Sequence, residues 1–284
     1  MNLCVSVLGI LLWLIQGCVT ARPIKPVLLT EEFAAYHGCF LLYNMKTKVW
    51  QQTYGGPMCR LSQTACSTFK VPLALMAFDN EILGDEKSKL VWDRKPHVIA
   101  SWNQDQTAVS WMKDSVVWFS QDITQALGPE RVTAYLESFQ YGNHNMSGGI
   151  KDAWLTKAPF VPEVKSNANK LQISPFVQAR FMIRLWSDPS DLPVKPSALE
   201  KTKNIIFIED SPEGFTISGK TGSGFTDSAF KRRLGWYVVH GEGHGEEYVA
   251  VVLIIDKSDQ NPGQFGSAVA RQIMQQTLHG YGLY

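Results

Sequence analysis

The chain has 284 residues, of which 45% are hydrophobic and 19% charged, a composition typical of a globular protein with one or two domains. Its 27 basic and 26 acidic side chains leave a formal net charge of +1. Nothing in this balance indicates nucleic acid or an acidic membrane surface as a partner, so we expect neither.

The N-terminal residues have the pattern of an export signal. Residues 1–21 carry no charged side chain, and Val5–Ile15 is an apolar run too short to span a membrane. Val19–Ala21 has the small residues of a cleavage site, so we predict a signal peptide at 1–21 and a periplasmic protein without a stable membrane span. The alternatives are a lipoprotein anchored through Cys18 and a buried N-terminal helix.

The first folded elements are predicted to be two strands, Tyr36–Asn44 and Thr47–Tyr54, joined as a β-hairpin. A loop rich in turn residues follows, and then Val71–Phe78, whose apolar residues have helical spacing. Pro72 is tolerated only in the first turn of a helix. We therefore expect this helix to begin near Ser67.

Ser67 and Lys70 form an S-x-x-K pattern at this helix start, where one turn of helix would place both side chains on one face. The helix N-terminus adds partial positive charge and free N–H groups beside the hydroxyl. A nucleophile, an adjacent base and an oxyanion donor are what acyl transfer requires. A chain of this length has roughly one such pattern by chance, so the pair alone does not establish catalysis.

Of the five cysteines, Cys4 and Cys18 lie in the predicted signal peptide, which leaves Cys39, Cys59 and Cys66. A disulfide between Cys39 and Cys59 would suit an exported protein, but its geometry does not follow from the sequence. Cys66 neighbours Ser67, yet no histidine forms an evident pair with it. We predict that Cys66 is a small packing residue.

The rest of the chain alternates between helical and strand-forming regions. Helices are predicted at Val117–Leu127, Pro129–Phe139 and Pro175–Trp186, strands at Asn204–Ile208, Phe215–Lys220, Leu234–His240 and Tyr248–Ile255, and a final helix at Gly266–Leu278. This order predicts an α+β fold, in which an antiparallel β-sheet is flanked by helices and carries an all-helical subdomain. Residues 22–80 and 197–284 would form the α/β part and 81–196 the helical part, with the site in the cleft between them.

A second motif, Lys220-Thr221-Gly222, is predicted to end a strand and is followed by Ser223. Because glycine has no side chain, Gly222 permits a ligand to approach the strand edge closely. The structural alternative is a strand end with a solvated lysine.

Further candidates lie in the middle region. Ser115 precedes Val117 at the expected start of the first middle helix, where a helix cap is the alternative role for the serine. Tyr141 and Asn143 lie in the loop after the second middle helix, which a glycine stop would also explain. Trp154 would otherwise be a core residue.

Taken together, S-x-x-K, S-x-V, Y-G-N, W-L and K-T-G in this order resemble the class D (oxacillinase-type) serine β-lactamases, from about His37 to the C-terminus. Class A enzymes have S-D-N as the second motif, and Val117 stands where that asparagine would be. The resemblance implies a fold like the transpeptidase domain of penicillin-binding proteins, in a monomer or homodimer. It also implies hydrolysis of the β-lactam ring of penicillin-type antibiotics, hence resistance, without a metal or cofactor.

The resemblance assigns roles to the catalytic residues. Ser67 would attack the lactam carbonyl, and Ser115 would relay a proton to the lactam nitrogen. Lys70 would be carboxylated by CO2 to N6-carboxylysine and serve as general base, which requires a neutral amine of the kind that burial produces. Trp154 would donate its indole N–H to the carbamate.

The implied substrate-binding residues surround this centre. Lys220 and Thr221 would hold the substrate carboxylate, and the backbone N–H groups of Ser67 and Ser223 would bind the oxyanion. Val117 would keep the site dry, and Tyr141 and Asn143 would shape the wall near it. Gly222 would let a ligand approach the strand edge.

The chain departs from the family pattern in two places. Many members bind the substrate carboxylate with an arginine near the start of the last helix, but residues 264–268 contain none, so Ser267 would contribute instead. The segment Leu155–Lys170 is longer than the family usually has, which suggests an altered substrate range.

Three other functions stay open. A β-lactam sensor domain shares these motifs and acylates without turnover, although such sensors are tethered by membrane helices. A cell-wall peptidase acylates in the same way, but Val117 and Trp154 argue against it. An exported structural protein would require every motif to be coincidental.

Overall fold

The computed structural model describes residues 27–164, 168–226, 229–259 and 263–284. The predicted signal peptide, including Cys18, lies outside the described residues. Within the described ranges, none of the helices combines the length and apolar character needed to span a bilayer.

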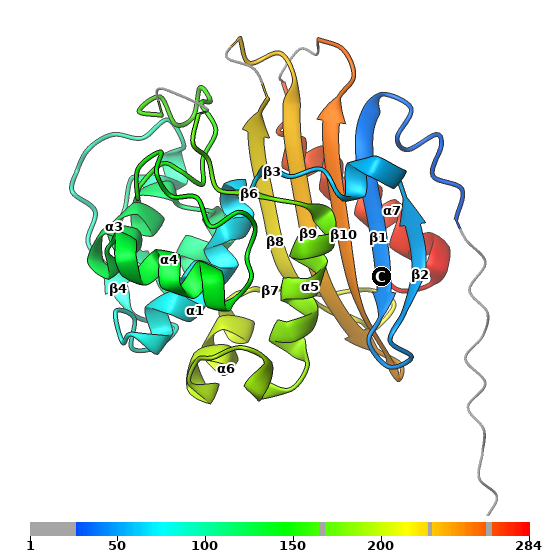
Figure 1. The fold of residues 1–284 in the computed structure, drawn as a ribbon, viewed down its shortest axis with the longest axis horizontal. Coiled ribbons are helices and arrows are strands. Elements are labelled where there is room, and N and C mark those ends of the chain that lie inside the picture. The colour runs from blue at the N-terminus through cyan, green and yellow to red at the C-terminus, as the bar shows by residue number, and fades with distance from the viewer. Residues whose placement is uncertain (1–26, 165–167, 227–228, 260–262) are drawn as a thin grey trace, which may run out of the picture.

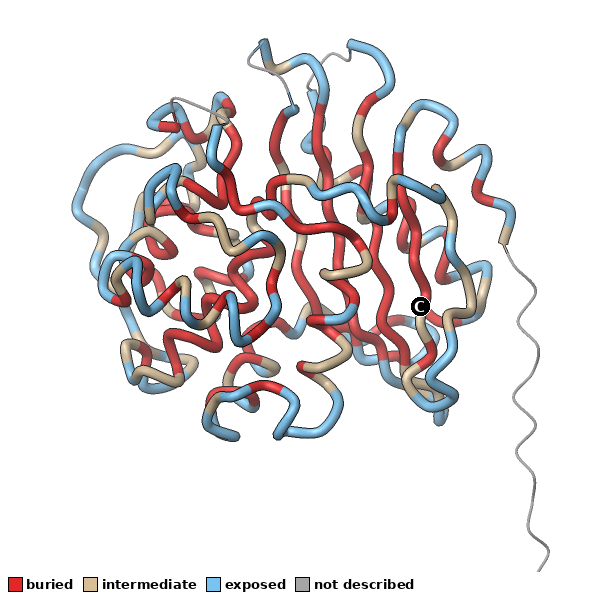
Figure 2. Tube along the Cα trace, viewed as in Figure 1, coloured by how far each residue is buried: buried red, intermediate tan, exposed pale blue. Residues whose placement is uncertain are grey.

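An antiparallel sheet of six strands forms the centre of the molecule, in the order β2-β1-β10-β9-β8-β7 (Figure 1). Its central strands are buried along almost their whole length, because helices cover both faces (Figure 2). The strands are β1 Tyr36–Asn44, β2 Val49–Tyr54, β7 Phe207–Asp210, β8 Thr216–Phe225, β9 Arg233–Gly243 and β10 Glu246–Asp256.

Helix α7, Gly266–Tyr281, covers one face of this sheet, and α5, Pro175–Trp186, lies across the other (Figure 1). A second lobe beside β8 contains α1 Lys70–Asp79, α2 Ala108–Asp114, α3 Val117–Leu127 and α4 Pro129–Ser138, and α6 Pro196–Ile205 packs against α1. Short strands pair β3 Gln63–Thr64 with β6 Gln172–Ile173, and β4 Lys89–Leu90 with β5 Gln106–Thr107. Short 3-10 helices span Gly56–Cys59, Cys66–Phe69, Ala100–Trp102 and Pro189–Asp191.

The predicted α+β class is confirmed, but several element boundaries were wrong. The strand expected at Asn204–Ile208 begins only at Phe207, since α6 extends to Ile205. Pro196 is the first residue of α6, which the sequence analysis missed because the helix ends at Ile205, where an apolar run that resembles a strand begins. Helix α2 was also missed, although Thr107 caps it.

Two further differences affect the site. The K-T-G motif lies within β8 rather than at its end, because the strand continues to Phe225 and pairs with β9 throughout. Helix α5 falls inside the predicted helical part, residues 81–196, but packs on the sheet.

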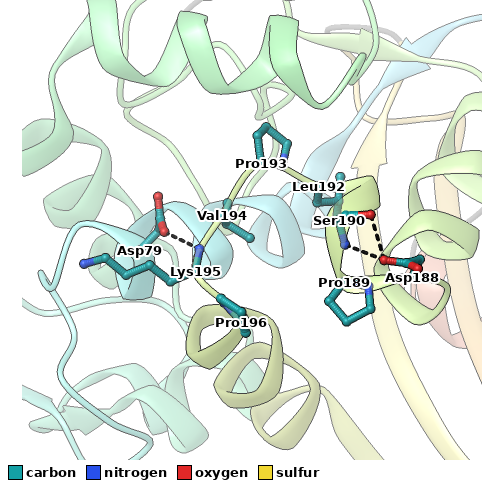
Figure 3. A pocket seen from close by; sticks show the side chains of 9 residues that line it. All are labelled: Asp79, Asp188, Pro189, Ser190, Leu192, Pro193, Val194, Lys195 and Pro196. Carbon is teal, nitrogen blue, oxygen red and sulfur yellow. Dashed lines mark hydrogen bonds between the residues drawn. The ribbon is translucent and has the colours of Figure 1, made fainter.

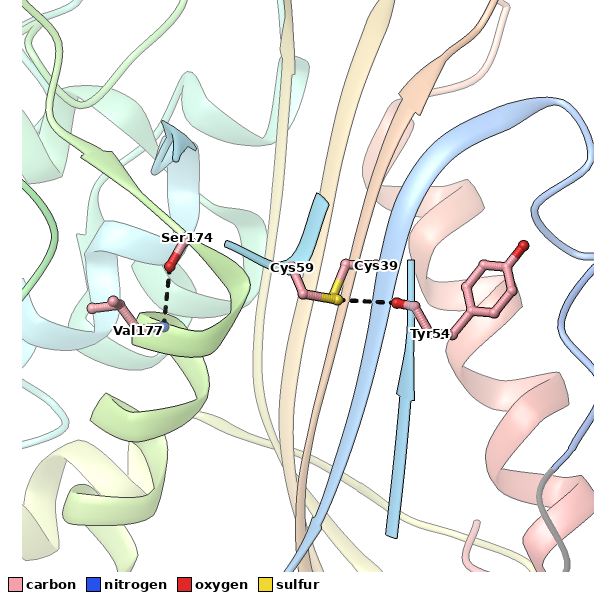
Figure 4. Close-up of a disulfide and its surroundings, with 5 residues drawn as sticks. All are labelled: Cys39, Tyr54, Cys59, Ser174 and Val177. Carbon is pink, nitrogen blue, oxygen red and sulfur yellow. Dashed lines mark hydrogen bonds between the residues drawn. A yellow bond between two sulfur atoms is a disulfide. The ribbon is translucent and has the colours of Figure 1, made fainter. Parts of the chain in front are cut away.

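A disulfide joins Cys39 of β1 to Cys59, in the 3-10 helix of the loop that leads to Ser67 (Figure 4). The Cα atoms of the two residues are 5.1 Å apart. Figure 4 shows the bridge between β1 and the start of α5, where Ser174 caps the helix by accepting from the Val177 N–H. The bond therefore ties the loop before the Ser67 turn to the central sheet.

We predict that replacing both Cys39 and Cys59 by serine lowers the free energy of unfolding by about 3 kcal/mol, because the bridge closes a loop with a sequence separation of 20. Urea unfolding of the variant and the oxidised protein measures this difference. Unfolding midpoints that coincide would contradict the prediction, and wild-type protein under reducing conditions serves as a second test.

Candidate active site

Ser67 lies in the short 3-10 turn Cys66–Phe69, directly before α1. Cys66 has a φ of 50°, in the left-handed region, and thereby reverses the chain just before the serine. The Lys70 Nζ lies 3.1 Å from the Ser67 Oγ, within hydrogen-bond distance. The sequence pattern thus places hydroxyl and amine in direct contact, as expected for two residues one turn apart.

Lys70 is completely buried, and its Nζ lies 4.7 Å from the centroid of the Trp154 ring. Burial lowers its pKa well below the usual value for lysine, and the nearby charge of Lys220 lowers it further. Burial therefore favours the uncharged free base of this amine.

The Trp154 side chain is fully buried, and its indole N–H has no hydrogen-bond partner among the residues that the structure describes. An unsatisfied buried donor costs about 1–3 kcal/mol. The indole therefore offers an unused donor beside Lys70, where an acceptor would be stabilised.

Ser67 opens into a pocket of about 240 Å³ between its own turn, the α2–α3 connection, β8 and the start of α7. Predicted site residues from four segments meet in its lining: Ser67, Ser115, Val117, Thr221, Gly222, Ser223 and Ser267. Their convergence from positions 67 to 267 is what a shared site requires.

Ser115 does not open a helix, contrary to the sequence prediction. It ends α2 with a φ of 56°, and Val116 is the residue that precedes α3. The left-handed backbone at Ser115 creates the sharp connection between the two helices, and this connection lines the pocket. The role of an N-cap is thereby excluded for this serine.

Close packing holds β8 against the Ser67 turn. A Cβ at Gly222 would lie 3.3 Å from side-chain atoms of Cys66 and Thr68, and one at Gly224 would lie 2.3 Å from the Thr156 Oγ1. Glycine at these two positions therefore permits close packing of β8 within the protein, whereas the close approach of a ligand to this strand stays a prediction. Cys66 is fully buried in this contact, in agreement with a packing role, and burial raises the pKa of its thiol to about 12.

Ser223 on β8 is tied to the first turn of α7. The Ser223 hydroxyl donates to the Ser267 Oγ at 2.7 Å and accepts from the Ser267 backbone N–H at 2.9 Å. Ser267 therefore contacts β8, and two hydroxyls occupy this wall of the pocket.

Lys220 is 4% exposed, which excludes a solvated lysine at a strand end. Its Nζ donates to the Thr221 carbonyl at 3.3 Å and contacts the Thr221 hydroxyl at 3.4 Å. Burial lowers the pKa of this amine to about 7. Thr221 lines the Ser67 pocket, whereas Lys220 itself lines the neighbouring cavity.

Tyr141 and Asn143 lie behind the site and do not line the Ser67 pocket. The Tyr141 hydroxyl donates to Gln178 at 3.3 Å, and Gln178 donates to the Thr68 hydroxyl at 2.6 Å. These two hydrogen bonds connect Tyr141 to the turn that contains Ser67. The Asn143 side chain donates to the Lys170 carbonyl at 3.1 Å and holds the end of the long segment after Trp154.

Several pocket residues were not found in the sequence analysis. Apolar side chains from distant segments make up most of this group: Ile99, Trp102, Leu155, Phe160, Val161 and Phe265. The rings of Phe160 and Phe265 meet edge to face with centroids 5.2 Å apart. Three signals in the sequence touched some of these residues without marking them as pocket walls: the W-L motif, the extra length of residues 155–170 and the stretch 264–268.

A larger cavity, of about 630 Å³, lies beneath the connection between α5 and α6 (Figure 3). Its polar groups are used within the protein, since Asp79 accepts from the Lys195 N–H at 2.7 Å and Asp188 accepts from Ser190 at 2.8 Å. It contains no residue of the motifs, so size alone does not identify the site. Nor does any group of three or more His, Cys, Asp or Glu side chains in the described ranges form a candidate metal site.

Comparisons with known proteins agree with this geometry. The penicillin-binding-protein transpeptidase domain matches residues 38–279. β-Lactamase OXA-1 of Escherichia coli is 35% identical over 229 residues, which cover 78% of this chain and 77% of that protein.

Two solved structures are similar over nearly the whole chain. The class D β-lactamase BAT-2 has a TM-score of 0.76 and 29% identity, with 91% of this chain and 97% of that chain covered. The C-terminal domain of the Bacillus licheniformis BlaR penicillin receptor has a TM-score of 0.79 and 26% identity, with 92% and 97% covered. The motifs, their convergence in one pocket and these matches together show that the chain belongs to the class D β-lactamases, within the penicillin-binding-protein transpeptidase family.

Proposed function

We propose that the protein hydrolyses the β-lactam ring of penicillin-type antibiotics through an acyl-enzyme on Ser67, with carboxylated Lys70 as general base, and so confers resistance. The observation that carries this proposal is the fully buried Lys70, whose Nζ lies 3.1 Å from the Ser67 Oγ and beside the ring of Trp154, an indole with no hydrogen-bond partner among the described residues.

In the proposed acylation, the Ser67 oxygen gives up its proton and attacks the lactam carbonyl carbon. The C–N bond then breaks, and Ser115 passes a proton to the lactam nitrogen. Backbone N–H groups of Ser67 and Ser223 stabilise the negative oxygen. A water molecule attacks the ester in the second half, and the Ser67 hydroxyl is restored.

The surroundings of Lys70 fit a carboxyl group on its Nζ. Only an uncharged amine adds to CO2, and burial shifts the pKa of Lys70 in the direction that favours this form. The Trp154 indole supplies a donor that is otherwise unused. The carboxyl group would supply a base that takes the proton of Ser67 and later that of the attacking water.

Substrate recognition is assigned to the hydroxyls and the cation along β8. Lys220 is positioned through Thr221, and Thr221 and Ser267 face the pocket, so the substrate carboxylate would meet these groups. Val117 adds an apolar wall beside Lys70 and Ser67. Tyr141 and Asn143 act as positioning residues for the Ser67 turn and for the segment after Trp154.

We also propose that the protein is exported to the periplasm, on the basis of residues 1–21 and the disulfide, which persists in an oxidising compartment. The Cys39–Cys59 bond would then form after translocation.

Intact-protein mass spectrometry during incubation with benzylpenicillin tests the function. We expect a transient increase equal to the mass of the whole penicillin, located on Ser67, followed by return to the free protein as penicilloate accumulates. No adduct and no penicilloate would refute the proposed function.

The similarity to the BlaR penicillin receptor raises a second function, a sensor that is acylated without turnover. The same time course separates the two. A stoichiometric adduct that persists after the penicillin is removed would assign the sensor role, whereas steady-state turnover assigns the hydrolase.

The protonation of Lys220 predicts a pH dependence of substrate binding. Because its pKa in the folded protein is about 7, far below the usual value, the amine loses its charge as the pH rises through 7. We expect KM for benzylpenicillin to rise above this pH. Lys220→Arg keeps its charge and should remove the rise.

The lowered pKa of Lys220 also affects how the stability of the protein depends on pH. Between pH 7 and the ordinary lysine pKa of about 10.4, the unfolded chain binds the proton that folded Lys220 has lost, so this residue makes the protein more stable as the pH rises.

The KM measurements test the assignment of Lys220 to substrate binding. A KM for benzylpenicillin that does not change with pH in either the wild type or Lys220→Arg would contradict this assignment.

A further inference from the structure

A second cavity, of about 440 Å³, adjoins the Ser67 pocket at Thr221. It lies at the edge of β8 where β7 turns away, since the last pair between these strands is Phe207 with Ser218. Helix α2 forms its outer wall, and α7 contributes Arg271. Ser67 does not line this cavity, which is therefore a compartment separate from the Ser67 pocket. Lys220 is part of its wall.

The charged side chains that line this compartment are all basic. Lys113, Lys220 and Arg271 line it, and none of the described lining residues is acidic. Arg271 is partly neutralised because it pairs with Glu209 at 2.7 Å. Lys220 is buried, and within the described residues its Nζ contacts the carbonyl and hydroxyl of Thr221, at 3.3 and 3.4 Å, and no carboxylate. A buried cation without a carboxylate partner favours an anion in the adjoining space.

A second polar group points to the same kind of ligand. Tyr237 lines the cavity, is 1% exposed, and has a hydroxyl without a hydrogen-bond partner among the described residues. Its neighbour Tyr284 donates to Glu209, and it also lies close enough to the Tyr237 hydroxyl to help burial raise the pKa of that group. A carboxylate oxygen would accept from the Tyr237 hydroxyl, and so satisfy a buried donor.

Most of the remaining lining side chains are apolar, with Asn204 and Thr221 as the polar exceptions. Met112, Ile205 and Ile208 line the cavity, and at its rim Val109 and Phe207 are 46% and 49% exposed. Apolar side chains of this size gain free energy when a ligand covers them. The ligand that matches both parts has an anionic head and an apolar body.

We propose that this compartment binds a small carboxylate with an apolar body, and that its occupancy weakens substrate binding by drawing on the charge of Lys220. The inference goes beyond the proposed function, because the binding itself does not depend on β-lactam hydrolysis. Two sources supply this chemistry: short-chain carboxylates of the cell or its surroundings, and the penicilloate that the reaction releases.

Isothermal titration calorimetry with hexanoate, benzylpenicilloate and neutral hexanol tests the binding. We expect saturable binding of hexanoate and none of hexanol. Binding of penicilloate in addition would identify product as a second source, and binding of penicilloate without hexanoate would make product the only one. If neither carboxylate binds, the proposal is wrong, whether or not the protein hydrolyses penicillin.

Steady-state kinetics locate the ligand. A ligand in this compartment should raise KM for benzylpenicillin to a plateau, because substrate still reaches Ser67 at lower affinity. A ligand in the Ser67 pocket would raise KM without limit, and that result would overturn the proposal.

Val109→Trp fills the rim of the cavity without touching the Ser67 pocket, and should weaken hexanoate binding by about tenfold or more while hydrolysis without hexanoate stays unchanged. Lys113→Glu, on an exposed position of α2, provides a second variant that repels the anion without changing the core. Unchanged hexanoate affinity in both folded variants would contradict the assigned site.

Discussion

Replacing Ser67 by alanine is expected to abolish hydrolysis of penicillins, with a loss on the order of 10⁴-fold or more, because the substitution removes the proposed nucleophile. Ser115 also lines the pocket, but it is Ser67 whose Oγ lies within hydrogen-bond distance of the Lys70 Nζ, at 3.1 Å. The fold should be unaffected, since Ser67 is a half-exposed residue in a turn. Nitrocefin hydrolysis and intact mass after incubation with benzylpenicillin measure the effect.

A matched control is Ser190→Ala, in the cavity of Figure 3, which should retain full activity. If Ser67→Ala still accumulates a covalent penicilloyl adduct, the nucleophile has been wrongly assigned. If it loses the adduct but hydrolyses nitrocefin at an unchanged rate, the acyl-enzyme mechanism itself is wrong.

Trp154→Phe is expected to lower activity at ambient CO2 by about 10- to 100-fold, because a hydrogen bond to a charged group contributes about 1.5–3 kcal/mol. The change keeps an aromatic ring beside Phe69, whose centroid lies 5.8 Å from that of Trp154, and removes only the N–H. Added bicarbonate should restore much of the rate by mass action. Initial rates across a range of bicarbonate concentrations give the apparent affinity for CO2.

Trp186→Phe is the matched control. This indole N–H is likewise buried and unpaired, but its ring stacks on His240 at 3.7 Å, on the side of the sheet covered by α5. The variant should keep the wild-type dependence on bicarbonate. Equal responses of both tryptophan variants would mean that packing, and not the indole donor, explains the loss.

Some features of the molecule follow directly from local sequence. The long strands β9 and β10 are continuous apolar runs, and Ser67 and Lys70 are three residues apart, so one helical turn brings them together. Tertiary contacts decide the rest. Helix α6 was missed because its final residues, Asn204 and Ile205, lead into an apolar strand without a break in pattern.

The side chains that form the pocket walls were even harder to predict from the sequence. Phe160 and Phe265 meet across the pocket although 105 positions separate their numbers, and neither belongs to a motif. Conversely, Tyr141 and Asn143 belong to a motif but support the site from behind. A motif marks residues that matter to a site without showing whether they face the substrate.

The central claim is that the buried, uncharged Lys70 captures CO2 next to the Trp154 indole. ¹³C NMR of the protein equilibrated with ¹³C-labelled bicarbonate tests it most directly. We expect a single carbamate resonance in the wild type, a weaker one in Trp154→Phe at equal bicarbonate, and none in Lys70→Ala. A wild-type protein that hydrolyses penicillin but shows no carbamate resonance at saturating bicarbonate would contradict the claim.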